Sequence, residues 1–304
     1  MQALSANDSF SKPIYALLGL FLFVLFFGAC GSFLMQGLAY FAGTDYQDAI
    51  IQLKTNNTLD IRNYVRLASI ISQVTTFLLP ALLLIVFIHP SNWKQVFKIH
   101  QRPHFQLVAL GVIFLFATFP IAQWLLAFNK SLPLPEWATS LEEDLGALST
   151  ALLVMESPWE LLFNIFAIAV IPAIGEELLF RGVLQQKLQD WTKQPHLGVW
   201  LAAIIFSAFH GQFEGFLARL LLGAALGYLL CWTNNLWIPI LAHFFNNALQ
   251  VTVQYFSNTQ LEMDRIPEIP TYLLLLSLIL AAVLAYFILH FNRKTLVHDR
   301  KQTN

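Results

Sequence analysis

The chain has 304 residues, of which 57% are hydrophobic and only 12% are charged, whereas soluble globular proteins average roughly 25% charged residues. This composition is typical of membrane proteins, and the apolar runs leave no room for a sizeable soluble domain. The formal net charge of −1 gives no electrostatic argument for nucleic acid as a partner. We therefore expect an all-α, polytopic bundle of helices whose main surroundings are the lipid bilayer.

Apolar runs long enough to cross a hydrocarbon core, about 20 residues each, predict about eight transmembrane helices. In chain order they are expected at 14–42, 67–88, 105–128, 160–186, 197–213, 216–232, 236–256 and 271–291. The first run is too long for the apolar part of a signal peptide, so we interpret it as a true span. On this basis we divide the chain into N-terminal helices and loops (1–159), a membrane core (160–255) and a final span with a basic tail (256–304).

The lysines and arginines of the connecting loops predict the orientation of the bundle. With both termini in the cytoplasm, ten of these residues fall inside and five outside. The inner ten are Lys12, Lys94, Lys98, Arg102, Lys187, Lys193, Arg293, Lys294, Arg300 and Lys301, and the outer five are Lys54, Arg62, Arg66, Lys130 and Arg265. We expect an integral protein of the cell membrane with both termini cytoplasmic.

One outer connection has a helical pattern of its own. The segment 141–157, LEEDLGALSTALLVMES, begins with acidic residues and continues with apolar residues at partly helical spacing. This pattern predicts a helix that lies on the membrane surface. A solvated connector is the simpler interpretation of its role, and a substrate gate is the alternative.

Three ionisable residues lie in the expected fourth span, within the sequence EELLFR. Such groups are costly in the membrane unless they are paired or face water. Glu177 and Arg181 are four positions apart with the acid first, which favours a structural ion pair on one helix face. Glu176 is rotated by about 100° from that face, so it is left as the candidate general base or acid. Pro172 and Gly175 are expected to loosen the helix and admit water or substrate.

Two further polar pairs fall in later spans. FSAFH places Phe206 and His210 four positions apart in the expected fifth span, and HFFNN places His243 and Asn247 four apart in the seventh. Each pair is expected on one helix face. Counting about 1.5 Å per residue from the helix ends puts Glu176 and the polar members of both pairs in one layer, so a shared site is geometrically allowed.

Taken together and in this order, EELLFR, FSAFH and HFFNN match the patterns EExxxR, FxxxH and HxxxN. This combination resembles the CAAX-protease and bacteriocin-processing family of intramembrane endopeptidases, called CPBP or Abi. The similarity covers about residues 160–255, and the first three expected spans carry no signature of the family. The resemblance implies hydrolysis of peptide bonds in membrane-associated peptides or proteins.

The resemblance also implies roles for single residues. Glu176 and His210 would activate the hydrolytic water, while His243 and Asn247 would position it or stabilise the tetrahedral oxyanion. A carboxylate and an imidazole can share one water, and an amide N–H suits an oxyanion. No cofactor is assigned. An asparagine amide is a poor zinc ligand and HExxH is absent, which favours metal-independent activation; a catalytic zinc held by Glu176, His210 and His243 stays open.

Two other classes of function use the same polar residues. In a transporter, the cluster would bind a cation or relay protons, and in an inactive scaffold it would bind a membrane partner. No inverted repeat is visible in the sequence, which disfavours a transporter. Glu176→Gln separates these classes, because hydrolysis needs a carboxylate at this position.

Overall fold

The computed structural model describes residues 12–257 and 269–302, with side chains as far as residue 293. Within these ranges the regular elements are all helices, three of which have π geometry and are labelled η. In chain order the elements are α2 (Pro13–Ala42), α3 (Tyr46–Thr55), α4 (Leu59–Gln73), η1 (Val74–Leu78), α5 (Leu79–Ile88), α6 (Trp93–Val96), α7 (Phe105–Ala117), α8 (Phe119–Lys130), α9 (Glu136–Leu152), α10 (Pro158–Asn164), η2 (Ile165–Val170), α11 (Ile171–Glu176), η3 (Glu177–Gln185), α12 (Gln186–Thr192), α13 (Pro195–Ala208), α14 (Phe216–Thr233), α15 (Trp237–Ser257) and α16 (Thr271–Gln302).

The all-α, polytopic prediction is confirmed, and the predicted count of eight spans is approximate. Six helical runs of the described chain are long and apolar enough to cross a membrane: Pro13–Ala42, Leu59–Ile88, Phe105–Lys130, Pro158–Thr192, Phe216–Thr233 and Thr271–Arg293. The expected fifth and seventh spans correspond to α13 and α15. Because α13 has 14 residues, it is about 21 Å long, which is shorter than a hydrocarbon core of about 30 Å.

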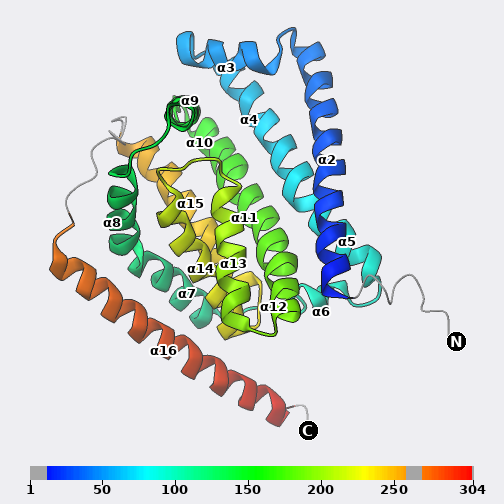
Figure 1. Ribbon diagram of the computed structural model, residues 1–304, viewed down its shortest axis with the longest axis vertical. Helices are drawn as coiled ribbons and strands as arrows, with labels where there is room; N and C mark the ends of the chain where they lie inside the picture. The colour runs from blue at the N-terminus through cyan, green and yellow to red at the C-terminus, as the bar shows by residue number, and fades with distance from the viewer. Residues whose placement is uncertain (1–11, 258–268, 303–304) are drawn as a thin grey trace, which may run out of the picture.

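The bundle has two distinct ends (Figure 1). Helix α2 begins, and α16 finishes, at the end where α6 and α12 lie, whereas α3 and α9 lie at the opposite end. The two helices that carry the termini flank the bundle: α2 packs on α4, η1 and α5, while α16 packs on α7 and α8. The helices that carry the three polar motifs lie between these flanks (Figure 1).

Two predicted spans have wrong boundaries. Helix α4 begins at Leu59, so Arg62 and Arg66 lie on a helix and not in an outer loop. The hydropathy pattern placed both arginines outside the span because it takes no account of the ion pairs that they form inside the bundle. Helix α13 ends at Ala208 instead of running to 213. Gly211 follows with φ of 66°, a left-handed conformation that suits glycine and stops a helix.

The segment predicted to form a surface helix is helical, with shifted ends. It runs over Glu136–Leu152 as α9, not over 141–157, and it packs on α3 and α4. The chain turns before 157 because a new helix starts there: the Ser157 hydroxyl accepts a hydrogen bond from the Glu160 N–H, and Pro158 occupies the first helical position. Both features are strong signals for a helix N-terminus.

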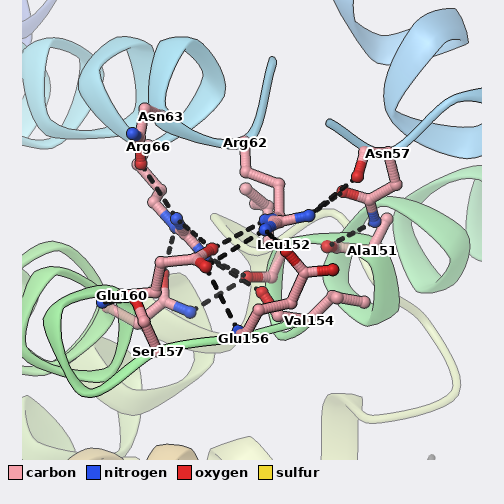
Figure 2. A network of polar contacts seen from close by, with 11 residues as sticks. Asn57, Arg62, Asn63, Arg66, Ala151, Leu152, Val154, Glu156, Ser157 and Glu160 are labelled. Carbon is pink, nitrogen blue, oxygen red and sulfur yellow. Dashed lines mark hydrogen bonds and ion pairs between the residues drawn. The ribbon is translucent and has the colours of Figure 1, made fainter. Parts of the chain in front are cut away.

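A buried network of charged side chains joins α4 to α10 at the end of the bundle where α3 and α9 lie (Figures 1 and 2). Arg62 donates to both oxygens of the Glu160 carboxylate, at 2.7 and 3.1 Å, and to Glu156 at 2.7 Å. Arg66 donates to Glu160 at 3.0 Å and to Asn164 at 2.7 Å. Both arginines are 1% exposed and Glu160 is 4% exposed. This Arg62–Glu160 network anchors the helix that leads to Glu176.

That helix runs without a gap from Pro158 to Thr192, but it is not a regular α-helix throughout. It changes to π geometry before Pro172, in η2, and again directly after Glu176, in η3. Proline has no N–H for the helical ladder, and π turns concentrate at functional sites. The sequence predicted a loosened helix around Pro172 and Gly175, and the structure shows wider π turns on both sides of them.

Four of the basic residues used to predict the orientation have no described side chain. Arg265 is outside the described residues, and no side chain from Lys294 onward, including Arg300 and Lys301, is described. The described inner residues Lys94 and Lys187 lie on or next to α6 and α12, which share the end of the bundle with the start of α2.

Candidate active site

Glu177 is the centre of the polar cluster. Its carboxylate oxygen Oε1 accepts hydrogen bonds from Arg181 Nη1 at 2.6 Å and from His243 Nδ1 at 2.9 Å. Glu177 is fully buried and Arg181 is 1% exposed, so the ion pair predicted from their spacing is present. Glu177 also contacts His243, which the spacing of Glu177 and Arg181 in the sequence did not predict.

Arg181 connects the cluster to two neighbouring helices. Its Nη2 donates to the backbone carbonyl of Gly223 on α14 at 3.0 Å, and its guanidinium lies 4.4 Å from the ring centroid of Phe206 on α13. A Cβ on Gly223 would lie 3.0 Å from the Phe206 ring, so an added methyl group would require the ring to shift by a few tenths of an ångström. Cation–π contacts of this kind contribute about 0.5–2 kcal/mol, with the larger values in desolvated sites.

Glu176 faces His243 from the adjacent position. Its Oε2 lies 4.0 Å from His243 Nε2, and the two residues are 5% and 6% exposed. Because Nδ1 of His243 contacts the Glu177 carboxylate, that nitrogen carries the proton and Nε2 is the nitrogen directed at Glu176. The site therefore contains a carboxylate–imidazole–carboxylate sequence in which only Glu177 is neutralised by an arginine.

His210 borders this cluster without a direct contact to Glu176 among the described interactions. It lies in the turn after α13, where its Nδ1 donates to the Phe206 carbonyl at 2.9 Å. The ring centroid of Phe206 is 4.9 Å from His210 and 6.3 Å from His243. The prediction that His210 lies on the helix of the fifth span is wrong, because the helix ends two residues earlier. Its neutral imidazole keeps Nε2 as an acceptor.

Asn247 lies one turn beyond His243 on α15 and is held at both ends of its amide. Its Nδ2 donates to the Ile168 carbonyl of η2 at 3.2 Å, and its Oδ1 accepts from Asn246 Nδ2 at 2.9 Å. An amide nitrogen has two N–H groups, so one stays available for an oxyanion. Asn246, at 8% exposed, orients Asn247 and was missed by the sequence analysis, although the pair NN was visible.

Phe206 contacts more residues of the site than its motif predicted. The sequence singled it out only as the partner of His210 at helical spacing, whereas its ring packs against Arg181 and both histidines. An aromatic ring at this position excludes water from the Glu177–Arg181 pair. It therefore strengthens the electrostatic interactions in the cluster, because they act at a lower effective dielectric constant.

The candidate zinc ligands predicted from the sequence are Glu176, His210 and His243. A catalytic zinc site usually needs three protein ligands at about 2.0–2.3 Å, and no three His, Cys, Asp or Glu side chains in the described part of the chain are grouped to hold a metal ion. Nδ1 of His210 donates to a carbonyl and Nδ1 of His243 donates to Glu177. Metal-bound histidines are oriented in the same way, so Nε2 of each ring is the nitrogen that would face a metal. The steps proposed below use only the side chains of this chain.

Comparisons with known proteins locate the same segment. Residues 158–249 match the family model described as type II CAAX prenyl endopeptidase Rce1-like. This segment is similar to that family, and we call it the Rce1-like segment. The resemblance to the CPBP family stated from three motifs is thereby confirmed, and all six predicted site residues lie inside the Rce1-like segment.

Two relatives from Bacillus subtilis match the chain over a similar length. YpbD is 34% identical over 90 residues, which are 28% of this chain and 43% of YpbD. The protein named "Putative membrane peptidase YdiL" is 27% identical over 86 residues, which are 28% of this chain and 35% of the relative. The chain thus aligns with less than half the length of each. No solved structure gives a significant match.

Proposed function

We propose that the protein is an intramembrane endopeptidase that hydrolyses peptide bonds of membrane-associated peptides or proteins. The observation that carries the proposal is the buried Glu176 carboxylate, which faces His243 at 4.0 Å and is not neutralised by the arginine that neutralises its neighbour. The Rce1-like segment, and the relative named as a membrane peptidase, support the same activity.

The spacing of Glu176 and His243 suits a shared water. A separation of 4.0 Å is too long for a direct hydrogen bond, but one water placed to the side can lie at about 2.8 Å from both atoms. Glu176 takes a proton from this water as it attacks the scissile carbonyl, and the same carboxyl group returns the proton to the leaving amine. Glu177 holds His243 in the orientation that this step needs.

His210 and Asn247 complete the machinery at its edges. The resemblance assigns His210 to water activation with Glu176, and its neutral Nε2 is an acceptor that a water can reach. Asn247 offers one amide N–H to the tetrahedral oxyanion, with its orientation fixed by Asn246 and the Ile168 carbonyl. Such fixed donors typically contribute a hundredfold or more to the rate in a water-excluded site.

The chemistry we propose is independent of metal, and the membrane orientation follows the positive charges. Glu176 acts as the base because it is a buried carboxylate that faces His243, while Arg181 pairs with Glu177 instead. Both termini lie in the cytoplasm of a cell-membrane protein, consistent with the basic inner residues and with the shared end of α2 and α16 (Figure 1).

The test compares wild type with Glu176→Gln in detergent, with and without a zinc chelator. Cleavage of a membrane-embedded peptide library is read by mass spectrometry. We expect cleavage by the wild type that survives chelation and is lost in Glu176→Gln, because glutamine is nearly isosteric but is no base. Loss on chelation with recovery on added zinc would overturn the metal-independent mechanism. Identical products from both proteins would overturn the proposed activity.

A further inference from the structure

The turn that carries His210, residues 209–215, lies at membrane depth and is not helical. Helix α13 packs on α12, and its 14 residues span about 21 Å. With the α12–α13 connection at the membrane surface, the turn therefore begins inside a hydrocarbon core of about 30 Å. Irregular backbone at such depth must be covered by protein or face water. The element that covers this turn therefore controls how water and substrate reach His210.

Helix α9 lies against this turn. Glu142 on α9 accepts a hydrogen bond from the backbone N–H of Glu214 at 3.0 Å. Leu145, three positions further along α9, faces Gly211, which is the residue after His210. A Cβ on this glycine would lie 4.0 Å from the Leu145 side chain, at ordinary van der Waals distance. Helix α9 therefore covers the turn directly beside His210.

The contact between α9 and the turn includes the start of the helix. The ring of Trp137 packs edge-to-face against the ring of Phe213, with 5.3 Å between the ring centroids. Ala138, the next residue of α9, is 1% exposed. In this structure the first half of α9 is therefore closed on the turn.

The other end of α9 is held by buried groups. The Leu152 carbonyl accepts a hydrogen bond from Asn164 Nδ2 at 3.0 Å, and the Val154 carbonyl accepts one from Arg66 at 3.1 Å (Figure 2). Asn164 and Arg66 are 0% and 1% exposed. Leu148 and Leu152 also pack on the apolar cluster that α3 and α4 form. This end of α9 is thus part of the same buried region as the Arg62–Glu160 network.

The two ends of α9 are held with unequal strength. The first half is held to the turn by the hydrogen bond of Glu142, which is only half-buried, and by the Trp137 ring, which is 64% exposed. The ion pair of Lys54 with Asp144 ties the middle of α9 to α3 at 2.7 Å, but its side chains are 30% and 68% exposed, and such exposed pairs contribute little. Segments with few buried contacts open most easily, so α9 opens at its first half.

We propose that α9 is a lid on the site, hinged at residues 152–154 and latched to the turn by Glu142. The inference rests on the proposed function, in which a peptide and water must reach Glu176 and His210 together. When the first half of α9 lifts, the turn beside His210 is uncovered and the peptide and water enter from the end of the bundle where α3 and α9 lie. Lid opening of this kind limits turnover in many enzymes.

The first experiment locks the lid. Trp137→Cys and Phe213→Cys are introduced together after the two native cysteines are replaced, as Cys30→Ser and Cys231→Ser. A short bifunctional methanethiosulfonate joins the two thiols, and a reductant releases them. We expect the joined protein to lose about tenfold or more of its cleavage rate and to recover it on reduction. Each single cysteine variant keeps its rate after the same treatment. Full turnover in the joined protein overturns the lid.

A second readout needs no turnover. Hydrogen–deuterium exchange of the segment 209–217 is followed by mass spectrometry. Glu142→Leu removes the acceptor and is expected to speed this exchange by about tenfold, the typical effect of losing a hydrogen bond to a charged group. Glu142→Gln keeps an acceptor oxygen and stays closer to the wild type. Glu143→Leu, at the exposed neighbouring position, leaves the exchange unchanged, and the joined protein exchanges more slowly than its reduced form.

The exchange rates separate the lid from the proposed function. Equal exchange in Glu142→Leu and the wild type, or in the joined and reduced proteins, shows that α9 is a fixed brace and overturns the lid. If the wild type cleaves no peptide, the proposed function fails, and the exchange rates still decide whether α9 opens over the turn.

Discussion

The Arg62–Glu160 network gives the sharpest test of the packing around the site. In Glu160→Gln the side chain keeps its shape but loses its charge. The Glu160 carboxylate accepts three hydrogen bonds from Arg62 and Arg66 and a fourth from the Glu156 backbone N–H at 3.1 Å. The glutamine amide would point N–H groups at two guanidinium groups that are 1% exposed. Removing one partner of a buried ion pair typically costs about 3–5 kcal/mol.

The Glu156 carboxylate places the expected loss at the lower end of that range. Glu156 contacts Arg62 at 2.7 Å, but its side chain is 71% exposed, so it compensates Arg62 only partly and Arg66 not at all. We expect Glu160→Gln to lower the free energy of unfolding by about 3 kcal/mol, which corresponds to roughly 6–12 °C in the unfolding temperature of a domain of 150–250 residues. The measurement is thermal unfolding in detergent micelles, followed by tryptophan fluorescence.

Glu143→Gln is the matched control for this change, since Glu143 is an exposed glutamate on α9. We expect its unfolding temperature to stay within about 1 °C of the wild type, because surface substitutions of this kind are usually near neutral. The double variant Glu160→Gln, Arg66→Gln should lose less than the sum of the single changes, since it removes both charges of one pair. A shift below about 2 °C in Glu160→Gln, or additive losses in the double variant, would refute the reasoning.

Two further predictions concern the polar cluster itself. Glu177→Gln should lower the free energy of unfolding by about 3 kcal/mol or more, because Arg181 is 1% exposed and loses its counter-charge. Thermal unfolding of this variant is compared with that of Glu143→Gln. Equal unfolding temperatures of the two variants would contradict the prediction. His210→Gln and His243→Gln should each reduce kcat by roughly 10²–10⁴-fold, measured on the peptide that the wild type cleaves. His290→Gln, at an exposed position of α16, should keep full activity, and wild-type rates in either site variant would remove that histidine from the mechanism.

Local spacing predicted the part of the site that lies on one helix. Glu177 and Arg181 pair as their separation of four positions required, because a helix face is set by local geometry. The contact of Glu177 with His243 spans 66 positions and the contact of Arg66 with Glu160 spans 94. Such contacts depend on how helices pack, which no local pattern encodes, so they could not be predicted from one sequence.

The boundary errors have a related cause. Hydropathy treats each charge as a mark of the surface, so Arg62 and Arg66 were placed in a loop although both are buried and paired. It also treats Phe209 and Phe213 as a continuation of the fifth span, although Gly211 between them has φ of 66° and ends the helix. In both places a specific partner or backbone conformation outweighs the average polarity of the segment.

The two adjacent glutamates illustrate how neighbours in sequence acquire different chemistry. A rotation of about 100° per residue directs Glu177 at Arg181, where the ion pair holds the charge and the shared hydrogen bond orients His243. Glu176, on the next face, lies 4.0 Å from His243 Nε2 instead. Because Arg181 pairs with Glu177 and not with Glu176, the Glu176 carboxylate is left able to exchange a proton. The proposed chemistry therefore requires Arg181 to pair with Glu177 and not with Glu176. The π turn that starts at Glu177 separates the surroundings of the two carboxylates.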